Sequence, residues 1–158
     1  MKESWEHRAV ISGVGQSEAG RQLERSGFQL TLDAILTAIA DAGLTVDDID
    51  GLAIFPGGAQ ANVPGYSGAN LYEVQDALGI TTTWRQGQVE GASLPFYGPA
   101  LAVASGQAKH VVVFRTVKEG SAARKAGGRP AYGSTKPTAD GPLAWWLPLG
   151  ALSPVCHV

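Results

Sequence analysis

The sequence predicts an α/β fold, because short apolar runs alternate with amphipathic or small-residue segments along the chain. The strongest helix signal lies at residues 28–42, where apolar residues recur every three or four positions. The strongest strand signal is 110–114, whose continuous apolar run is typical of a sheet covered on both faces. The chain has 158 residues, 44% of them hydrophobic, which is enough for one domain with a buried core.

The first elements are a strand and a helix. Residues 8–15 are expected to form a buried strand that runs into a glycine turn. In helix 28–42, Ser26 is a plausible N-cap, and Gly43 suits the left-handed position just past the end. The expected buried face consists of Phe28, Leu32, Ile35, Leu36 and Ile39.

The middle of the chain continues the alternation. Residues 45–48 have the pattern of a capping box and predict one short helical turn. Residues 52–55 predict a strand, 69–78 a modest helix, and 81–84 a strand rich in β-branched residues. These elements, together with 110–114, predict a layered build.

Residues 91–105 are almost all small or apolar and predict a helix buried on all sides. Pro99 lies too deep for an undisturbed helix, so it should kink the helix or shorten it. After residue 118 the apolar periodicity disappears, which predicts a long loop region at about 118–150.

Composition excludes several classes of protein. No apolar run approaches the ~18 residues that span a bilayer, and the polar N-terminus does not resemble a secretory signal, so a cytoplasmic protein is expected. The single cysteine excludes an internal disulfide framework, and it and the three histidines show no zinc spacing, so no metal is expected. The Gly13-Val-Gly15 pair lacks the third glycine of a dinucleotide fingerprint.

Charge is unevenly distributed. Residues 1–90 hold twelve Asp or Glu against five Lys or Arg, whereas residues 91–158 hold two against seven. A local basic excess can mark an anionic ligand, although a solvated loop gives the same pattern. Nucleic acid is a poor candidate, because the domain is not basic overall and has no recognised binding motif.

Several segments together resemble the thiolase superfamily, in its sterol-carrier and lipid-transfer branch. They are Ala9-Val-Ile-Ser-Gly-Val-Gly-Gln-Ser17, Ala38-Ile-Ala-Asp-Ala-Gly-Leu44, Val46-Asp-Asp-Ile-Asp-Gly-Leu52, the small-residue helix ending Ala104-Ser-Gly106, and His110-Val-Val-Val-Phe-Arg-Thr-Val117. The last is similar to a subgroup often encoded beside an OB-fold, zinc-ribbon partner. The resemblance implies that 1–158 is an N-terminal thiolase-like half, a layered mixed sheet around a buried helix, with the C-terminal half absent. It also implies a homodimer.

Thiolases carry an acyl group on a cysteine at the start of the buried helix. By the resemblance, Gly91 stands where that cysteine would be, in Gln88-Val-Glu-Gly-Ala-Ser-Leu94. Glycine has no side chain to acylate, so ordinary acyl-cysteine chemistry is not expected. Weak substitutes are Ser93, although a serine at a helix start is usually a cap, and Glu90 and Tyr97 as acid–base groups. Cys156 and His157 are adjacent, and adjacent residues rarely aim at each other.

The loop region of thiolase relatives helps to hold coenzyme A, whose phosphates need Arg or Lys. The resemblance therefore implies coenzyme A contacts, as part of the substrate and with no separate cofactor, from Arg124, Lys125, Arg129 and Lys136.

Two functions follow from the resemblance. The first is an enzyme acting on acyl-CoA without a cysteine nucleophile, by retro-aldol cleavage of lipid or steroid side-chain CoA thioesters with an OB-fold partner. The second is a non-catalytic protein that binds acyl-CoA or lipid, or serves as a scaffold. A fragment inactive by itself is a third possibility.

Overall fold

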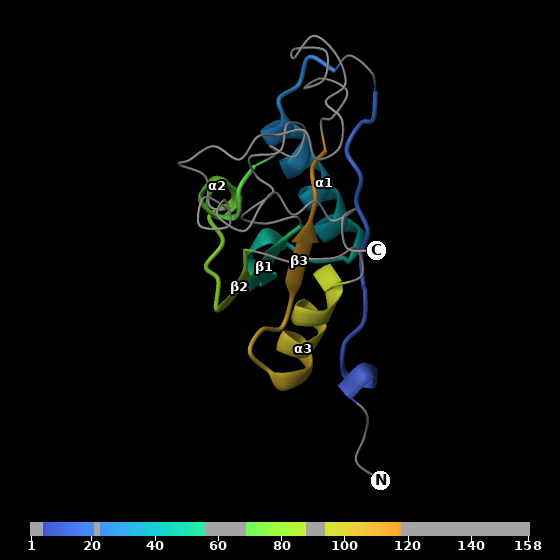
Figure 1. The fold of residues 1–158 in the computed structure, drawn as a ribbon, viewed down its shortest axis with the longest axis vertical. Helices are drawn as coiled ribbons and strands as arrows, with labels where there is room; N and C mark the ends of the chain where they lie inside the picture. Colours follow the sequence, from blue (N-terminus) through green and yellow to red (C-terminus); the bar gives the residue numbers. More distant parts are fainter. Residues whose placement is uncertain (1–4, 21–22, 56–68, 88–93, 118–158) are drawn as a thin grey trace, which may run out of the picture.

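The structure is a computed structural model, and it describes residues 5–20, 23–55, 69–87 and 94–117. Its sheet has three strands, β1 (Gly51–Ile54), β2 (Trp84–Gln86) and β3 (Val111–Phe114), in the order β2-β1-β3 (Figure 1). Both pairings are parallel, so the carboxyl ends of the three strands lie at the same edge of the sheet. The α/β class is confirmed. The expected mixed sheet is not found among the described strands, which are all parallel.

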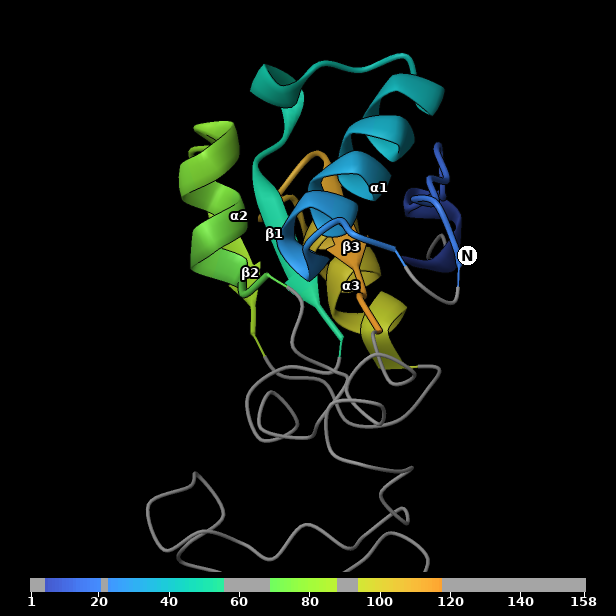
Figure 2. The ribbon, with the colours of Figure 1, turned by 90° about the horizontal axis from the view of Figure 1, so that it is seen from above.

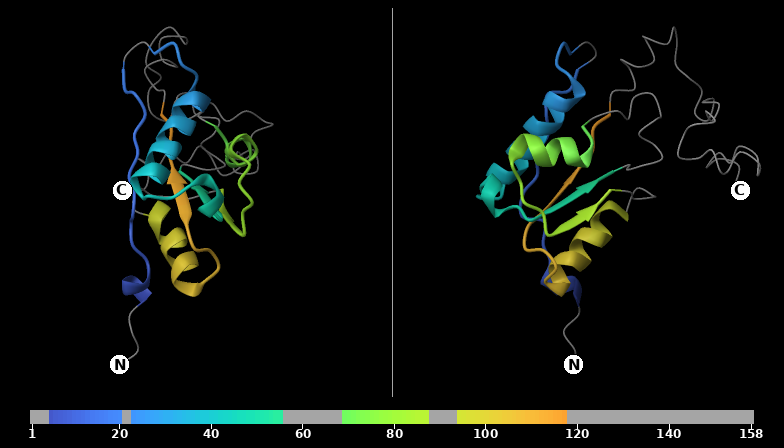
Figure 3. Two further views of the ribbon diagram at one scale, coloured as in Figure 1. Left: turned by 180° about the vertical axis from the view of Figure 1, so that it is seen from behind. Right: turned by 90° about the vertical axis from the view of Figure 1, so that its left-hand side faces the viewer.

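Three α-helices cover the two faces of this sheet, in the order α1 (Gly27–Asp41), α2 (Leu71–Leu78) and α3 (Tyr97–Ser105). The β1–α2–β2 and β2–α3–β3 connections cross the sheet in opposite directions, and right-handed crossovers then place α2 and α3 on opposite faces. Figure 3 shows α1 and α2 on one side of the strands and α3 on the other. Layers on both sides of a sheet agree with the predicted layered build.

The main core lies between the sheet and the α1–α2 layer. It contains the fully buried Ile35, Leu52 and Val74, each less than 2% exposed. Burial of a side chain of this size contributes about 1.5–3 kcal/mol. The other members of this cluster are Ile39, Ile49, Ala69, Leu71, Ile80, Val112 and Phe114. Leu36, expected on the same face, is instead 43% exposed, because α1 turns the Ile35–Ile39 stripe inward.

Short 3-10 turns and caps join the elements as the local sequence predicts. Ser26 and Gln29 form a capping box at the start of α1. Gly43 follows α1 with φ +70°. The predicted turn at 45–48 is η2 (Val46–Asp48), where the Asp48 carboxylate accepts from the Thr45 backbone N–H and hydroxyl. These predictions are confirmed.

The predicted first strand is wrong. After η1 (Trp5–Arg8), residues 9–20 pair with no described strand. Val10 is 85% exposed and Val14 71% exposed, so the apolar run is not buried. The segment lies along α1, where a Cβ on Gly15 would fall 2.2 Å from the Ala34 carbonyl oxygen. Gly13 and Gly15 therefore allow this segment to lie close against α1, and they do not form the expected turn after a strand.

The small-residue helix also differs from its prediction. The structure begins α3 at Tyr97, after η4 (Leu94–Phe96), and not at residue 91. Pro99 has no N–H to donate, so it fits only in a first helical turn, and the helix is shortened as predicted. Burial on all sides is wrong: Pro99, Ala102 and Ala104 are buried, but Leu101 is 46% exposed.

Candidate functional site

The carboxyl ends of the three parallel strands meet at one edge of the sheet, and the start of α3 lies at the same edge (Figure 2). Phe55 follows β1, Gln86 ends β2 and Arg115 follows β3. In α/β proteins with parallel strands, ligands bind outside this edge. We call Phe55, Gln86, Tyr97, Gly98 and Arg115 the carboxyl-edge cluster.

The helix starts differ in how their free N–H groups are satisfied. The side chains of Ser26 and Asn70 accept from the first turns of α1 and α2, each within a capping box. The N-cap of α3 is Phe96, and no side chain caps it. Helix α3 thus reaches this edge without the polar cap that α1 and α2 have.

Gln86 carries the most unusual polar atom of the cluster. Its side-chain oxygen, Oε1, is buried and has no hydrogen-bond partner among the described residues. The carboxamide packs against the first turn of α3, where a Cβ added to Gly98 would lie 1.8 Å from Oε1. Gly98 is therefore the residue type that leaves room for this carboxamide. Buried polar atoms are normally paired, so an exception in a fold needs a reason.

Arg115 supplies positive charge at the same edge. Its guanidinium carbon lies 5.2 Å from the centre of the Phe55 ring, within the range of a cation–π contact. The next residue, Thr116, shares a short hydroxyl–hydroxyl hydrogen bond with Thr31, a buried residue near the start of α1. The end of β3 is thus fixed to α1, while the Arg115 side chain is exposed and oriented by an aromatic ring.

The structure places one of the sequence-predicted catalytic candidates. Tyr97 is the first residue of α3 and is 56% exposed, so it belongs to the carboxyl-edge cluster. Glu90, Gly91 and Ser93 lie outside the described residues. The prediction that Gly91 opens the helix therefore stays a prediction, and the described part of the helix consists of η4 followed by α3 from Tyr97.

The predicted coenzyme A contacts, Arg124, Lys125, Arg129 and Lys136, also lie outside the described residues. So does the predicted loop region at about 118–150. The sequence patterns do not single out Arg115 or Gln86 as site residues. Their positions could have indicated a site, because Gln86 is a polar residue at the end of β2 and Arg115 directly follows β3.

The opposite end of the sheet is organised around Asp50. Its carboxylate accepts from the backbone N–H groups of Lys109 and His110, each at 2.9 Å. Its carbonyl oxygen accepts from the backbone N–H and the hydroxyl of Thr83. Asp50 therefore joins the amino ends of all three strands.

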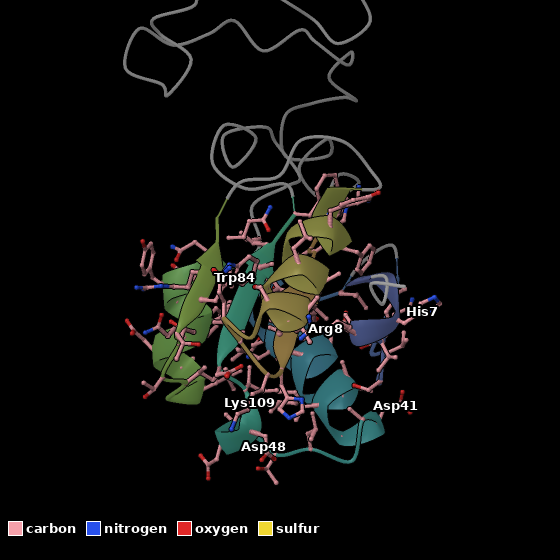
Figure 4. The ribbon with its side chains drawn as sticks, turned by 90° about the horizontal axis from the view of Figure 1, so that it is seen from below. His7, Arg8, Asp41, Asp48, Trp84 and Lys109 are labelled. Atoms are coloured by element: carbon pink, nitrogen blue, oxygen red, sulfur yellow. The ribbon has the colours of Figure 1, made fainter. Side chains whose placement is uncertain are left out.

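Asp48 and Lys109 lie at this same end of the molecule (Figure 4). Hydrogen bonds from the Thr45 backbone N–H and hydroxyl hold the pKa of Asp48 below its ordinary value. The Asp48 carboxylate, the Asp50 carboxylate and the Lys109 backbone N–H are all hydrogen-bonded within the fold, so we interpret this end as structural.

The described residues form neither a metal-binding cluster nor a membrane-spanning helix. No three His, Cys, Asp or Glu side chains in the described part of the chain gather as a set that could hold a metal ion. No helix in those ranges is both long and apolar enough to cross a membrane.

Comparison with known proteins finds relatives that are named as aldolases or as a lyase. No family model matches the chain. It is 32% identical over 148 residues to a steroid side-chain-cleaving aldolase of Thermomonospora curvata, an alignment that covers 92% of this chain and 36% of the aldolase. It is also 32% identical over 127 residues to the 17-hydroxy-3-oxo-4-pregnene-20-carboxyl-CoA lyase of Mycobacterium tuberculosis, covering 74% of this chain and 29% of the lyase.

A solved structure agrees with these sequence relatives. An Ltp2-ChsH2(DUF35) aldolase superposes with a TM-score of 0.57 at 28% sequence identity, over 92% of this chain and 34% of that one. The chain spans about a third of the length of the relatives it matches. None of these descriptions names a thiolase, so the thiolase-like fold stays a prediction. The proteins that this chain is similar to are aldolases and a lyase.

Proposed function

We propose that this chain forms part of an enzyme that cleaves a β-hydroxyacyl-CoA thioester by a retro-aldol reaction, with a steroid side chain as the substrate class. The observation that carries the proposal is the 32% identity to a steroid side-chain-cleaving aldolase over 92% of this chain. The absence of a cysteine at Gly91 supports it, because retro-aldol cleavage needs no acyl-enzyme.

The reaction has a simple balance. A base removes the proton of the β-hydroxyl group, the hydroxyl oxygen becomes a ketone oxygen, and the bond between the α and β carbons breaks. Its electron pair moves to the α carbon and is delocalised onto the thioester oxygen as an enolate, which a proton then converts to a shorter acyl-CoA. The enzyme must therefore provide a base and donors that stabilise the enolate.

The carboxyl-edge cluster is the part of the chain that we assign to this chemistry. Arg115 is a cation held over Phe55, and a guanidinium suits the phosphates of coenzyme A. Tyr97, exposed at the start of α3, is the acid–base candidate of the cluster. We place the base that starts the reaction outside the described residues.

The finer features of the proposal come from the sequence resemblance. They are a thiolase-like fold without the cysteine nucleophile, a homodimer, and an OB-fold partner with a zinc ribbon. The Ltp2-ChsH2(DUF35) aldolase, whose name joins two proteins, supports the idea of a partner. Arg124, Lys125, Arg129 and Lys136 remain our proposed additional contacts to coenzyme A.

A turnover assay tests the proposed function. The full chain, alone and with a DUF35 partner protein, is incubated with a β-hydroxyacyl-CoA that bears a steroid side chain, and release of the ketone is followed by mass spectrometry. Ketone formation is expected with the partner present. Saturable binding of the thioester with no ketone would instead favour the acyl-CoA-binding or scaffold function.

A variant of the cluster tests where the thioester binds. Arg115→Gln removes the cation and keeps a shorter polar side chain, so the affinity for free coenzyme A should fall about tenfold, the loss of one charged contact. Arg85→Gln is the matched control, since Arg85 lies in β2 over Tyr72 and outside the cluster. An equal loss in both variants would mean that charge alone, and not the cluster, attracts the ligand.

A further inference from the structure

The buried oxygen of Gln86 is not explained by packing. Thr31, the buried polar residue of α1, pairs its hydroxyl with the Gly27 carbonyl and with Thr116. Gln86 Oε1 has no such partner among the described residues. Leaving a buried acceptor unpaired costs free energy, and an apolar side chain of the same length would fill the space without that cost.

Gly98 shows that the carboxamide has a defined place. A Cβ at this position would lie 1.8 Å from Oε1 and 2.8 Å from the amide carbon. A glycine in the first turn of a helix also lowers helix propensity relative to alanine. The described part of the chain thus contains two locally unfavourable features, an oxygen with no partner there and a helical glycine, and both involve the Gln86 side chain.

Gln86 and Gly98 both lie at the carboxyl edge of the sheet. Gln86 is the last residue of β2, at the carboxyl edge, and its carboxamide touches the first turn of α3. An unpaired acceptor at the edge where ligands bind is complementary to a hydrogen-bond donor.

We propose that Gln86 is a ligand-binding residue, whose Oε1 accepts a hydrogen bond from a hydroxyl or amide N–H group of the bound acyl-CoA. The inference rests on the proposed function, because a β-hydroxyacyl-CoA carries donors of both kinds, the β-hydroxyl and the amides of its pantetheine arm. Gly98 leaves the space that holds the carboxamide beside the first turn of α3, at the edge where we place the ligand.

The decisive variant is Gln86→Met, which keeps the length of the side chain and removes the oxygen. Without an unpaired acceptor the unliganded protein should melt about 2–4 °C higher. The dissociation constant of the ligand should rise about 3- to 10-fold, since one hydrogen bond is lost. Gln16→Met, at an exposed position before α1, should change neither quantity.

Three probes locate the donor by calorimetry: a steroid-bearing β-hydroxyacyl-CoA, the same thioester without its hydroxyl, and free coenzyme A. A loss confined to the hydroxylated thioester assigns the donor to the hydroxyl, and a loss with all three assigns it to the pantetheine amides. Unchanged affinity for all three, or a Gln86→Met protein that does not fold, would overturn the inference. A wild-type chain that binds none of them would instead sink the proposed function itself.

A second variant tests the role of Gly98. Gly98→Ala displaces the carboxamide and should weaken binding of the hydroxylated thioester about 3- to 10-fold in the wild-type background. In a Gln86→Ala background the same change should have no further effect, because the added methyl group has no carboxamide to displace. Equal losses in both backgrounds would refute the coupling of the two residues.

Discussion

The two ends of the parallel sheet differ in how their polar groups are hydrogen-bonded. At the amino end, Asp50 binds backbone groups of the segments that lead into β2 and β3, and its polar atoms are satisfied within the fold. At the carboxyl end, the buried Gln86 oxygen has no partner among the described residues, Phe96 caps α3 without a side-chain bond, and Arg115 carries a cation. The amino end therefore stabilises the fold, and the carboxyl end is where we propose that the ligand binds.

The largest effect is expected at Asp50. Asp50→Ala removes the acceptor of two backbone N–H groups and should lower the free energy of unfolding by about 2–4 kcal/mol. Urea denaturation measures the change. Asp50→Asn keeps one acceptor oxygen and should lose less; a variant with alanine as stable as wild type would show that these hydrogen bonds have no energetic role.

Gly51 gives the next largest effect at the same end. A Cβ at Gly51 would lie 2.7 Å from the Val111 Cγ2 methyl group, so Gly51→Ala overpacks the pairing of β1 with β3. We expect a loss of about 1–3 kcal/mol by urea denaturation. Val111→Ala removes the opposing methyl groups and should reduce the loss in the double variant. If the losses of stability in the two single variants simply added in the double variant, a steric clash would not be the cause.

A capping residue gives a smaller effect. Ser26→Ala removes the side-chain acceptor for the Gln29 N–H at the start of α1 and should cost about 1 kcal/mol in thermal or urea unfolding. Ser26→Asp keeps an acceptor and should retain most of the stability. If alanine and aspartate behaved alike, the capping box would not be the source of the stabilisation.

Asp48 should show the smallest effect, and it depends on pH. Because hydrogen bonds from Thr45 lower the pKa of Asp48 in the folded state, its stabilisation is present above the unfolded pKa and is lost as pH falls through the folded pKa. The unfolding midpoint of wild type should thus fall faster with acidification than that of Asp48→Asn. If the unfolding midpoints of the two proteins fell in parallel with pH, Asp48 would make no such contribution.

Local chemistry made the helix ends predictable from the sequence. Ser26, Gly43, Thr45 and Asp48 act within a few residues of themselves, and all four occupy the predicted positions. The exposed, unpaired segment at 9–20 was not predictable in this way, because whether an apolar run joins a sheet depends on a partner strand that is distant in sequence. The same apolar pattern fits a strand and an extended segment on a helix.

The candidate site was only partly predictable. Tyr97 was chosen for its residue type near the start of a helix, and it lies at the carboxyl edge. Gln86 was missed, because its importance depends on contact with Gly98, twelve residues later, across a strand–helix connection. Glycine inside the predicted helix was the available signal, since an interior helical glycine often marks close approach by another group.

Amide hydrogen exchange with a steroid-bearing β-hydroxyacyl-CoA tests most directly whether the carboxyl edge is the ligand site. The account predicts slower exchange on ligand addition at 86–87, 97–98 and 115–117, with no change at 50–51 and 109–110. Protection at the amino end instead, or at neither end of the sheet under saturating ligand, would contradict it.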